Sequence, residues 1–378
     1  MNIGLLGYGV VGAGVDHILK NHPYLHVTRV LSLFSTEEMA ARYTDNAETI
    51  LNDPEIDTVV EALGGVHPTY EFITAAMKAG KNVVSSNKAV VAAYYRELIS
   101  LSKEMGVSFR CTAAAGGGIP WLNSLERVKN NDEVNAVFGV MNGSCNYILN
   151  EMAGGRGFDD VLKDAQEKGC AERDPSADID GPDTVRKLMI SASIAFNGYY
   201  PEEAVPCRGI RNVTEDDIEY LKEKGLRLRL YAYARKEDGM VSACVEPCAF
   251  PEDSSFAHLP LNLNRIGCDL KYGGTLMFEG EGAGRYPTAS NVVRDLEDVA
   301  LLHPAFYSEG LDPLAIDNSK ICRAYYVRTD IVDPALEQIC IKKEGAHLLT
   351  KPVPVTEMHA LLSALEARGA SVFSAALL

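Results

Sequence analysis

NIGLLGYGVVGAGVDHILKNH, residues 2–22, combines a short apolar run, a glycine-rich turn and an amphipathic segment. The apolar run predicts a buried strand, and the segment after the turn predicts a helix. Gly7, Gly9 and Gly12 have the spacing G-x-G-x-x-G, which suits a tight turn, close approach of a pyrophosphate and close helix–strand packing. The N-terminus of the helix adds N–H groups that favour phosphate. The stretch predicts a dinucleotide-binding site, and a purely structural glycine turn is the alternative.

Strand and helix patterns alternate from this stretch to about residue 130. The predicted strands are 25–33, 58–62, 82–85 and 107–111, and the predicted helices are 69–79, 94–105 and 121–129. This alternation indicates a Rossmann-type, doubly wound parallel sheet whose ligand lies at the carboxyl ends of the strands. Lys88 follows one such strand end, so it is a candidate cation near a cofactor or substrate. A solvated surface lysine is the alternative.

The loop after the second predicted strand leaves the choice between NAD and NADP open. An acidic residue at this point would bind the ribose hydroxyls of NAD, and a nearby arginine would accommodate the phosphate of NADP. Ser32, Leu33, Phe34 and Ser35 stand there instead. We therefore expect either NADP or NAD as the cofactor.

A different pattern begins at residue 133. Predicted strands at 134–141, 227–235 and 241–250, with a hairpin around 270–279, are typical of an antiparallel sheet that binds substrate or joins two subunits. The helix 289–302 is expected to return to the first domain. The last part is predicted to contain strands at 321–327, 337–341 and 371–376 and a helix at 356–368.

The predicted fold class is therefore α/β with three parts. Residues 1–130 form a dinucleotide-binding Rossmann domain completed by the helix 289–302, residues 131–288 form an α+β domain for substrate binding and dimerisation, and residues 319–378 form a short α+β appendage. A chain of 378 residues is long enough for two or three such domains.

Charge narrows the range of partners. The 36 basic and 52 acidic residues give a net charge of −16, which disfavours nucleic acid and anionic membranes as partners. A phosphate-bearing ligand must therefore be held locally by backbone N–H groups or by one or two lysines. A small-molecule substrate fits this balance.

Cysteine usage indicates a reducing compartment. The nine cysteines are scattered and form no C-x-x-C pair, which fits reduced thiols better than a disulfide framework. Cys244 and Cys248 have no nearby histidine or second pair, so a zinc site is not expected. The apolar N-terminus lacks a basic leader and a long apolar run, so we expect neither a signal peptide nor a membrane span and place the protein in the cytoplasm.

QEKGCAERDPSADIDGPDTVRKLMIS, residues 166–191, concentrates carboxylates just before one lysine. Gly181-Pro182 predicts a helix start, and Asp183 and Lys187 are four residues apart, hence on one helical face. An isolated pair of this kind is usually a weak surface ion pair. Concentrated carboxylates, however, repel one another unless a cation or a cationic ligand group offsets their charge.

These stretches together resemble the homoserine dehydrogenases over about residues 1–300. The segments that carry the resemblance are GLLGYGVVGAGV (4–15), VVSSNKAVVA (83–92), GGGIP (116–120), GVMNGSCNYILNEM (139–152), AQEKGCAERDPSADIDGPDTVRKL (165–188) and GEGAGRYPTASNVVRDL (280–296). The NG-x-x-NYIL segment and the segment E-x-DP-x-x-D followed by G-x-D-x-x-x-K are specific to that family.

The resemblance implies a role for individual residues. Lys187 matches the proton donor, with Asp183 beside it, and Lys88 matches a lysine near cofactor and substrate. Glu172 and Asp183 match carboxylates that hold the polar groups of homoserine, and Asp178 is a further candidate in substrate binding. The implied cofactor contacts are Gly7, Gly9, Val10, Val11, Gly12, Lys88 and Gly169. A homodimer built through residues 133–285 is also implied.

The chain departs from the family at three places. Thr112 stands where the family usually has a glutamate associated with a monovalent cation; the other expected contacts of a sodium ion are backbone oxygens near Ala115 and Gly117. Ser144-Cys145 replaces the usual Thr-Thr. The tail 319–378 looks like a shortened ACT domain, which leaves regulation by threonine open.

The resulting hypothesis is the reversible reduction of L-aspartate 4-semialdehyde to L-homoserine. Hydride from the reduced nicotinamide adds to the aldehyde carbon, and the developing alkoxide needs a proton or cation within hydrogen-bond reach. Lys187 would supply it, and Asp183 would orient Lys187. The alternatives are a related Rossmann amino-acid or aldehyde reductase of other specificity and a catalytically inactive cofactor-binding sensor.

Overall fold

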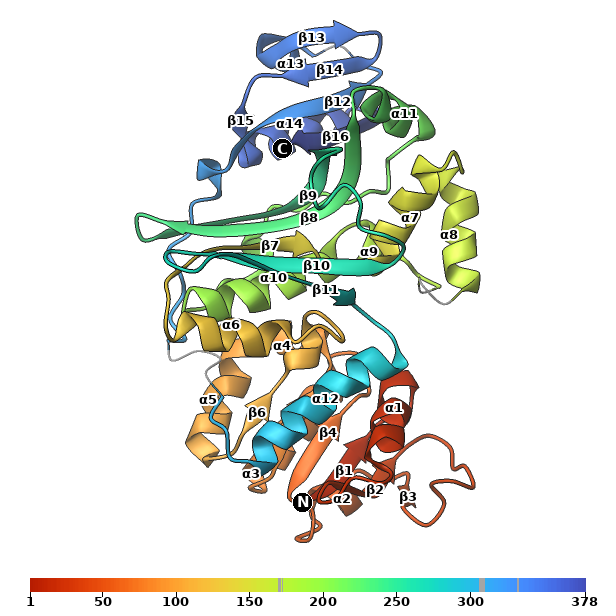
Figure 1. Cartoon of the computed structure of the whole chain (residues 1–378), viewed down its shortest axis with the longest axis vertical. Coiled ribbons are helices and arrows are strands. Elements are labelled where there is room, and N and C mark those ends of the chain that lie inside the picture. Colours follow the sequence, from red (N-terminus) through yellow and green to blue (C-terminus); the bar gives the residue numbers. More distant parts are fainter. Residues whose placement is uncertain (169–170, 172, 306–309, 332) are drawn as a thin grey trace. The chain divides into compact units, whose positions relative to one another are not determined.

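The computed structural model describes residues 1–168, 171, 173–305, 310–331 and 333–378 (Figure 1). The chain divides into two compact units. The first unit comprises Met1–Asp132, Met189–Tyr200 and Gly280–Pro313, and the second comprises Glu133–Leu188, Pro201–Glu279 and Leu314–Leu378. Each unit is therefore built from segments that are distant in the sequence.

A parallel sheet forms the centre of the first unit. Its strands are β1 (Asn2–Leu6), β2 (His26–Leu31), β3 (Tyr43–Thr44), β4 (Thr58–Glu61), β5 (Asn82–Ser85) and β6 (Phe109–Arg110). They follow the order β3-β2-β1-β4-β5-β6, and every neighbouring pair is parallel. The chain thus moves outward from β1 in both directions, which confirms the doubly wound Rossmann-type sheet.

Helices cover this sheet. They are α1 (Val10–Leu19), α2 (Glu48–Leu51), α3 (Thr69–Lys78), α4 (Lys88–Ala93), α5 (Tyr95–Met105), α6 (Trp121–Lys129) and α12 (Arg285–Ala300), with a 3-10 turn at Thr112–Ala114. The distant helix α12 packs against α1 (Figure 1). A Cβ on Gly14 would lie 2.7 Å from the Arg285 oxygen, so the two helices approach closely. Helix α12 therefore belongs to the first unit.

A mixed sheet forms the second unit. Its strands are β7 (Val134–Val140), β8 (Leu226–Glu237), β9 (Met240–Pro251), β10 (Leu263–Leu270), β11 (Gly274–Glu281), β12 (Cys322–Thr329), β13 (Cys340–Glu344), β14 (His347–Thr350) and β16 (Val372–Leu377), in the order β11-β10-β7-β8-β9-β16-β12-β14-β13; β15 (Val353–Pro354) pairs with β12. Strands β16 and β9 pair in parallel, while the pairs of β7 with β10 and of β8 with β7 and β9 are antiparallel. The strands of the C-terminal tail therefore extend the same sheet.

The helices of the second unit are mostly short. They are α7 (Gly143–Ala153), α8 (Phe158–Glu167), α9 (Ser176–Ile179), the beginning of α10 (Pro182–Ala195), α11 (Glu215–Glu223), α13 (Pro334–Ile339) and α14 (Val355–Ala367), with 3-10 turns at Glu202–Ala204 and Asn318–Lys320. Met358, Leu362 and Leu365 of α14 lie in one buried cluster with Tyr325 and Val327 of β12. Burial of these side chains fixes the tail on the sheet.

One predicted strand is wrong. Residues 337–341 were expected to be extended, but the helix α13 occupies most of this range and β13 begins only at Cys340. Asp333 caps the helix, because its Oδ1 accepts hydrogen bonds from the N–H groups of Ala335 at 2.8 Å and Leu336 at 3.3 Å. Pro334 follows at the first helical position, where it costs no hydrogen bond. The capping aspartate and the proline therefore favour a helix here more strongly than the alternation of apolar residues favours a strand.

Candidate active site

The helix α10 begins where Gly181-Pro182 predicted it to begin, at Pro182. Gly181 has φ +103°, and a Cβ there would lie 2.5 Å from the Cys207 sulfur, so this turn requires glycine. One turn into the helix, Lys187 Nζ lies 2.7 Å from Asp183 Oδ2. Lys187 is 7% exposed and Asp183 is 3% exposed. The pair is therefore buried rather than an ordinary surface ion pair.

Asn142 joins two carboxylates of the acidic stretch. Its Nδ2 donates to Asp178 Oδ1 at 2.7 Å and to Asp183 Oδ2 at 2.9 Å. Its Oδ1 accepts from the backbone N–H of Cys145 at 2.8 Å, which caps α7. The helix α7 therefore begins at Gly143, directly after this cap. The cap fixes the amide so that its donors face the carboxylates.

A backbone oxygen completes the surroundings of Lys187. The Met141 oxygen accepts from Lys187 Nζ at 2.7 Å and from Asn264 Nδ2 at 2.9 Å. Asn264 is fully buried, and its Oδ1 has no hydrogen-bond partner among the residues that the structure describes. A buried polar atom of this kind is costly unless water or a ligand binds it. Lys187 is therefore held between a carboxylate and a carbonyl, beside an acceptor that a ligand can use.

Two other carboxylates of the stretch are satisfied by the chain itself. Arg211 binds Asp180 with two hydrogen bonds, at 2.6 Å from Nε and 2.7 Å from Nη2. Asp174 Oδ1 accepts from the N–H of Ser176 at 3.1 Å. Asp180 therefore needs no ligand group to offset its charge, because an arginine more than thirty residues later does so.

Cys145 occupies one of the two positions where the chain departs from the usual Thr-Thr. Its thiol is buried and donates to the backbone oxygen of Asp178 at 3.3 Å. Burial, followed by the charges of Asp178 and Asp183, raises the pKa of this thiol well above its usual value. Cys145 is therefore a neutral donor that supports the position of Asp178, and not a nucleophile.

In the first unit, two glycines of the turn are required sterically, and the third faces open space. Gly7 has φ +100°, and a Cβ there would lie 2.6 Å from the Ala62 oxygen. A Cβ on Gly12 would lie 2.0 Å from the Gly7 oxygen, whereas one on Gly9 would meet open space. Val10 and Val11 begin α1, and no described side chain caps that helix. Open space before uncapped N–H groups fits a pyrophosphate.

Lys88 begins α4 directly after the end of β5. Asn87 caps this helix, since its Oδ1 accepts from Ala89 N at 3.0 Å and Val90 N at 3.3 Å. The Ser85 hydroxyl donates to Glu61 Oε2 at 2.5 Å, which links the ends of β5 and β4. Burial raises the pKa of Glu61. These bonds fix the backbone from which Lys88 projects.

The cations near β2 do not settle the choice between NAD and NADP. Arg42 follows this strand, but it binds Asp16 at 2.6 and 3.0 Å, and the Tyr8 hydroxyl donates to the same carboxylate at 2.8 Å. Leu33 is fully exposed and Phe34 is 60% exposed. No acidic residue stands at Ser32 to Ser35, but the exposed Glu37 and Glu38 follow in the same loop.

Comparisons with known proteins agree on one family. The family model described as homoserine dehydrogenase matches residues 120–296, and the model of its NAD-binding domain matches residues 7–112. A homoserine dehydrogenase of Synechocystis is 36% identical over 332 residues, covering 83% of this chain and 77% of its own. The one from Bacillus subtilis is 33% identical and covers 78% of this chain and 72% of its own.

Solved structures give the same result. The crystal structure of a homoserine dehydrogenase from Thiobacillus denitrificans superposes with a TM-score of 0.90 at 30% identity, covering all of this chain and 98% of the other. The chain belongs to the homoserine dehydrogenase family. It is accordingly an oxidoreductase that acts on the CH–OH group of a small molecule, homoserine, with NAD or NADP as cofactor.

Some of the predicted site residues lie close together in the structure, and two others fall outside the residues that it describes. Lys187, Asp183 and Asp178 lie together in the second unit, while Lys88 and the glycine turn lie in the first. Gly169 and Glu172 fall outside the described residues. The functional neighbours that sequence reasoning missed are Asn142, Asn264, Met141 and Arg211. Only Asn142 had a local signal, since asparagine before a helix is a preferred cap.

The expected cation contacts of the dehydrogenase fit a sodium ion poorly. The Gly117 oxygen already accepts from Asn291 Nδ2, and no carboxylate stands at position 112. The Thr112 hydroxyl instead donates to Asp295 Oδ1 at 2.6 Å, and its backbone N–H donates to Asp295 Oδ2 at 2.9 Å. A cation near Ala115 would therefore lack an anionic ligand at the expected place.

The buried carboxyl of Asp295 gives the dehydrogenase a pH dependence that can be measured. Burial, partly offset by Thr112, raises its pKa from 3.8 to about 6. The contribution of this group to folding is therefore greatest below about pH 4 and is lost as the pH rises to about 6. Relative to Asp295→Asn, the wild type should gain about 1 kcal/mol of unfolding free energy between about pH 7 and about pH 5.

Urea unfolding followed through Trp121 fluorescence measures this difference, because Trp121 is the single tryptophan and lies in the same unit as Asp295. The asparagine variant is the control, because all other titrating groups are the same in both proteins. A difference between the two proteins that stays constant with pH, or that shrinks toward pH 5, would contradict the raised pKa.

Proposed function

We propose that the chain interconverts L-aspartate 4-semialdehyde and L-homoserine with Lys187 as the proton donor and acceptor. The observation that carries this assignment is the buried pair of Lys187 and Asp183, held at 2.7 Å and backed by Asn142. A buried lysine between a carboxylate and a carbonyl keeps its three donors in a defined arrangement. That arrangement suits delivery of a proton to one oxygen of a bound substrate.

In the direction of aldehyde reduction, a reduced nicotinamide, when bound, would supply the hydride that the aldehyde carbon accepts. Lys187 gives a proton to the carbonyl oxygen as negative charge develops on it. Asp183 stabilises the charged ammonium of Lys187. In the reverse direction, Lys187 accepts the proton of the homoserine hydroxyl. The Met141 oxygen, which accepts from Lys187, restricts the rotation of the ammonium.

We assign substrate binding to the acidic residues around this pair. Asp178 is half-buried and held by Asn142, so it presents a fixed carboxylate to the ammonium of an amino-acid substrate. Glu172 is proposed for the same task on the basis of the family resemblance. Asp180 is not proposed, because Arg211 already offsets its charge.

We assign cofactor binding to the glycine turn of the first unit. Gly7, Gly9, Val10, Val11 and Gly12 would hold the pyrophosphate at the N-terminus of α1, with Lys88 and Gly169 as further contacts. The open space at Gly9 supports this assignment. A hyperthermophilic archaeal homoserine dehydrogenase of similar fold, with a TM-score of 0.70, was solved in complex with NADPH. Ser32 to Ser35 leave room for the same cofactor here.

The direct test is homoserine-dependent reduction of NAD and of NADP by the purified chain, with and without sodium, potassium and threonine. We expect reduction of at least one cofactor, with a modest effect of the two cations. Turnover with another amino-acid alcohol but not homoserine would support the reductase of other specificity. Cofactor binding without any turnover would support the inactive sensor. Inhibition by threonine would show that the tail 319–378 is regulatory.

The domain roles and the assembly complete the proposal. We assign cofactor binding to residues 1–130 with α12, and substrate binding and homodimerisation to residues 131–288. The edge strand β11 carries Met277 at 47% exposure, and Tyr272 just before it is 80% exposed, which favours burial against a second subunit. Light scattering should give twice the mass of one chain.

We also propose a cytoplasmic location. The eight cysteines that the structure describes are thiols rather than disulfides, which fits a reducing compartment. Among the described residues, no helix has the length and apolarity needed to cross a membrane. Cell fractionation would check the location.

A further inference from the structure

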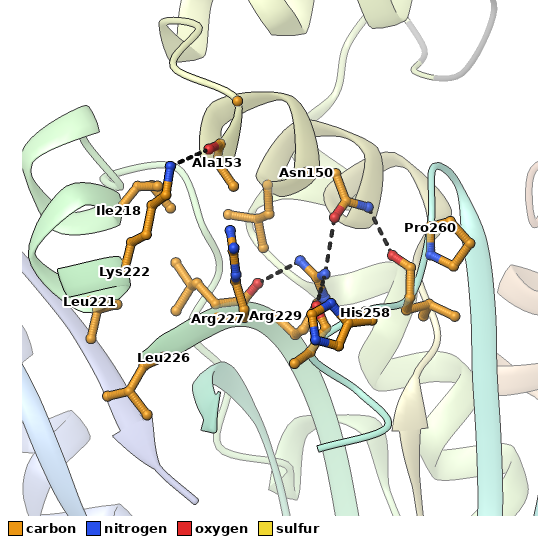
Figure 2. A pocket seen from close by; sticks show the side chains of 15 residues that line it. Asn150, Ala153, Ile218, Leu221, Lys222, Leu226, Arg227, Arg229, His258 and Pro260 are labelled. Carbon is orange, nitrogen blue, oxygen red and sulfur yellow. Dashed lines mark hydrogen bonds between the residues drawn. The ribbon is translucent and has the colours of Figure 1, made fainter. Parts of the chain in front are cut away.

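A pocket of about 350 Å³ lies within the second unit, at the C-terminal end of α7 (Figure 2). Its walls come from α7, α11, the first residues of β8 and the segment 257–260. Lys222, Arg227, Arg229 and His258 line it, and none of its described lining residues is aspartate or glutamate. In a chain with 52 acidic and 36 basic residues, such a gathering of basic groups calls for an explanation.

Arg229 is the most buried of these cations, at 3% exposure. Its guanidinium donates to the oxygens of Phe256 at 3.1 Å and Ala257 at 2.6 Å, and to Asn150 Oδ1 at 3.0 Å. It also donates to the oxygen of Leu228 at 3.0 Å. All four acceptors are neutral, so no described carboxylate offsets this buried charge. Burial accordingly lowers the pKa of Arg229 to about 10.

Two further cations face the same pocket, and their charge is only partly offset by neighbouring groups. Lys222 Nζ donates to the Ala153 oxygen at 3.4 Å, a long contact with a neutral group. Arg227 Nε pairs with Glu252 at 2.8 Å, which occupies one of its five N–H groups. Figure 2 shows both side chains lining the pocket together with Arg229. Like charges placed together repel unless an anion binds between them.

Part of this arrangement has a purely structural role. Lys222 faces the C-terminal end of α7, where a cation is favoured by the helix dipole, and Arg229 holds the backbone of residues 256–257. Arg227 and His258 likewise contact Glu252, through its carboxylate at 2.8 Å and its backbone oxygen at 2.7 Å. These roles account for each basic group separately, but they do not explain the cavity that lies among them. The remaining wall is mostly apolar and includes Leu149, Ile218, Leu221 and Leu226.

We propose that this pocket binds a small organic anion that has one compact oxyanion group, a carboxylate or a phosphate, on an apolar body. Lys222 and Arg227 would bind the oxyanion with charge-assisted hydrogen bonds, and the leucine wall would bury the apolar body. The proposal does not rest on the reaction proposed above. The pocket lies at the opposite end of α7 from Asn142, and a helix of this length spans about 16 Å.

Isothermal titration calorimetry of the full chain with three probes tests this site. Inorganic phosphate tests the oxyanion alone, phenyl phosphate tests a phosphate with an apolar body, and hexanoate tests a carboxylate with an apolar body. We expect phenyl phosphate or hexanoate to bind about tenfold or more tightly than inorganic phosphate, since burial of the apolar body adds affinity. Which of the two binds more tightly identifies the oxyanion.

Variants then locate the binding. Lys222→Ala and Arg227→Gln should each weaken the better probe by about tenfold or more, as expected for loss of one charge-assisted contact. Both side chains reach solvent, so these variants should fold, unlike a change at buried Arg229. Lys271→Ala is the matched control, because Lys271 pairs with Glu133 in the same unit and does not line the pocket.

Three results would overturn the proposal. The first is no measurable heat with any probe at concentrations of several millimolar, and the second is equal affinity in the two pocket variants and the control. The third is inorganic phosphate binding as tightly as the organic probes, which would remove the role of the apolar wall. The assay uses no substrate or cofactor, so its failure leaves the proposed dehydrogenase function untouched.

Discussion

Replacing Lys187 with alanine is expected to lower kcat for aspartate-semialdehyde reduction by about 10³-fold or more, because it removes the proposed proton donor, whose ammonium would also stabilise the developing alkoxide. The geometry leaves little scope for a substitute. Lys187 Nζ lies 2.7 Å from Asp183 Oδ2 and 2.7 Å from the Met141 oxygen, and only 7% of Lys187 is exposed. Steady-state oxidation of NADPH or NADH measures the effect.

The fold should survive this change. Removing one member of a buried ion pair is costly when the other charge loses all its partners. Asp183 keeps the hydrogen bond from Asn142 Nδ2 at 2.9 Å, so its carboxylate is not left without a donor. Lys187→Met, which retains most of the side-chain volume, is the second variant. Cofactor binding measured by fluorescence should match the wild type in both, because the glycine turn belongs to the other unit.

Lys271→Ala is again the matched control, since it removes a lysine from an exposed ion pair of the same unit. It should retain turnover within about twofold, as expected for a surface pair. Turnover of Lys187→Ala close to that of the wild type, in protein that binds the cofactor normally, would refute the assignment of the proton donor.

Local sequence patterns were sufficient to predict the features that depend only on residues close together in the chain. The glycine turn, the strand before it and the helix after it are contiguous, so their spacing alone predicted them. The same holds for the start of α10 at Pro182 and for the pairing of Asp183 with Lys187, which are one helical turn apart. Each of these follows from backbone geometry within a few residues.

Contacts between distant segments could not be predicted in this way. Arg211 reaches Asp180 and Asn264 reaches Met141 only because the second unit brings its segments Glu133–Leu188 and Pro201–Glu279 together. The parallel pairing of β16 with β9 is equally remote in sequence. This pairing makes the tail an extension of the main sheet. The alternation of apolar residues in 371–376 predicts a strand but not its neighbour in the sheet. That the tail is a shortened ACT domain stays a prediction.

Asn142 shows how one such contact changes the interpretation of the site. The sequence suggested Asp178 as a further candidate in substrate binding. In the structure Asn142 connects Asp178 to the pair of Asp183 and Lys187, because its amide donates to both carboxylates while its oxygen caps α7. The helix cap and the proposed catalytic pair of Asp183 and Lys187 are therefore coupled through one side chain, and a change at Asn142 can separate the two roles.

Replacing Asn142 with aspartate is expected to lower kcat/KM by about 100-fold at about pH 8, an effect comparable to the loss of a preorganised donor. The cap should persist, since aspartate accepts from the N–H of Cys145 as well as asparagine does. The two donated hydrogen bonds, however, become contacts between carboxylates at distances that are now 2.7 and 2.9 Å. Repulsion should displace Asp178 and Asp183 and so disturb Lys187.

The pH profile distinguishes this positioning role from a loss of folding. Like charges raise the pKa of a carboxyl group in such a cluster, so the Asn142→Asp variant should bind a proton as the pH falls and regain a donor. Its activity relative to wild type should therefore rise between about pH 8 and about pH 6. Asn142→Ser, which keeps a capping oxygen but adds no charge, should show a relative activity that is flat with pH. An Asn142→Asp variant with wild-type kcat/KM, or with a loss that does not change with pH, would show that the bridge between Asp178 and Asp183 does not position Lys187.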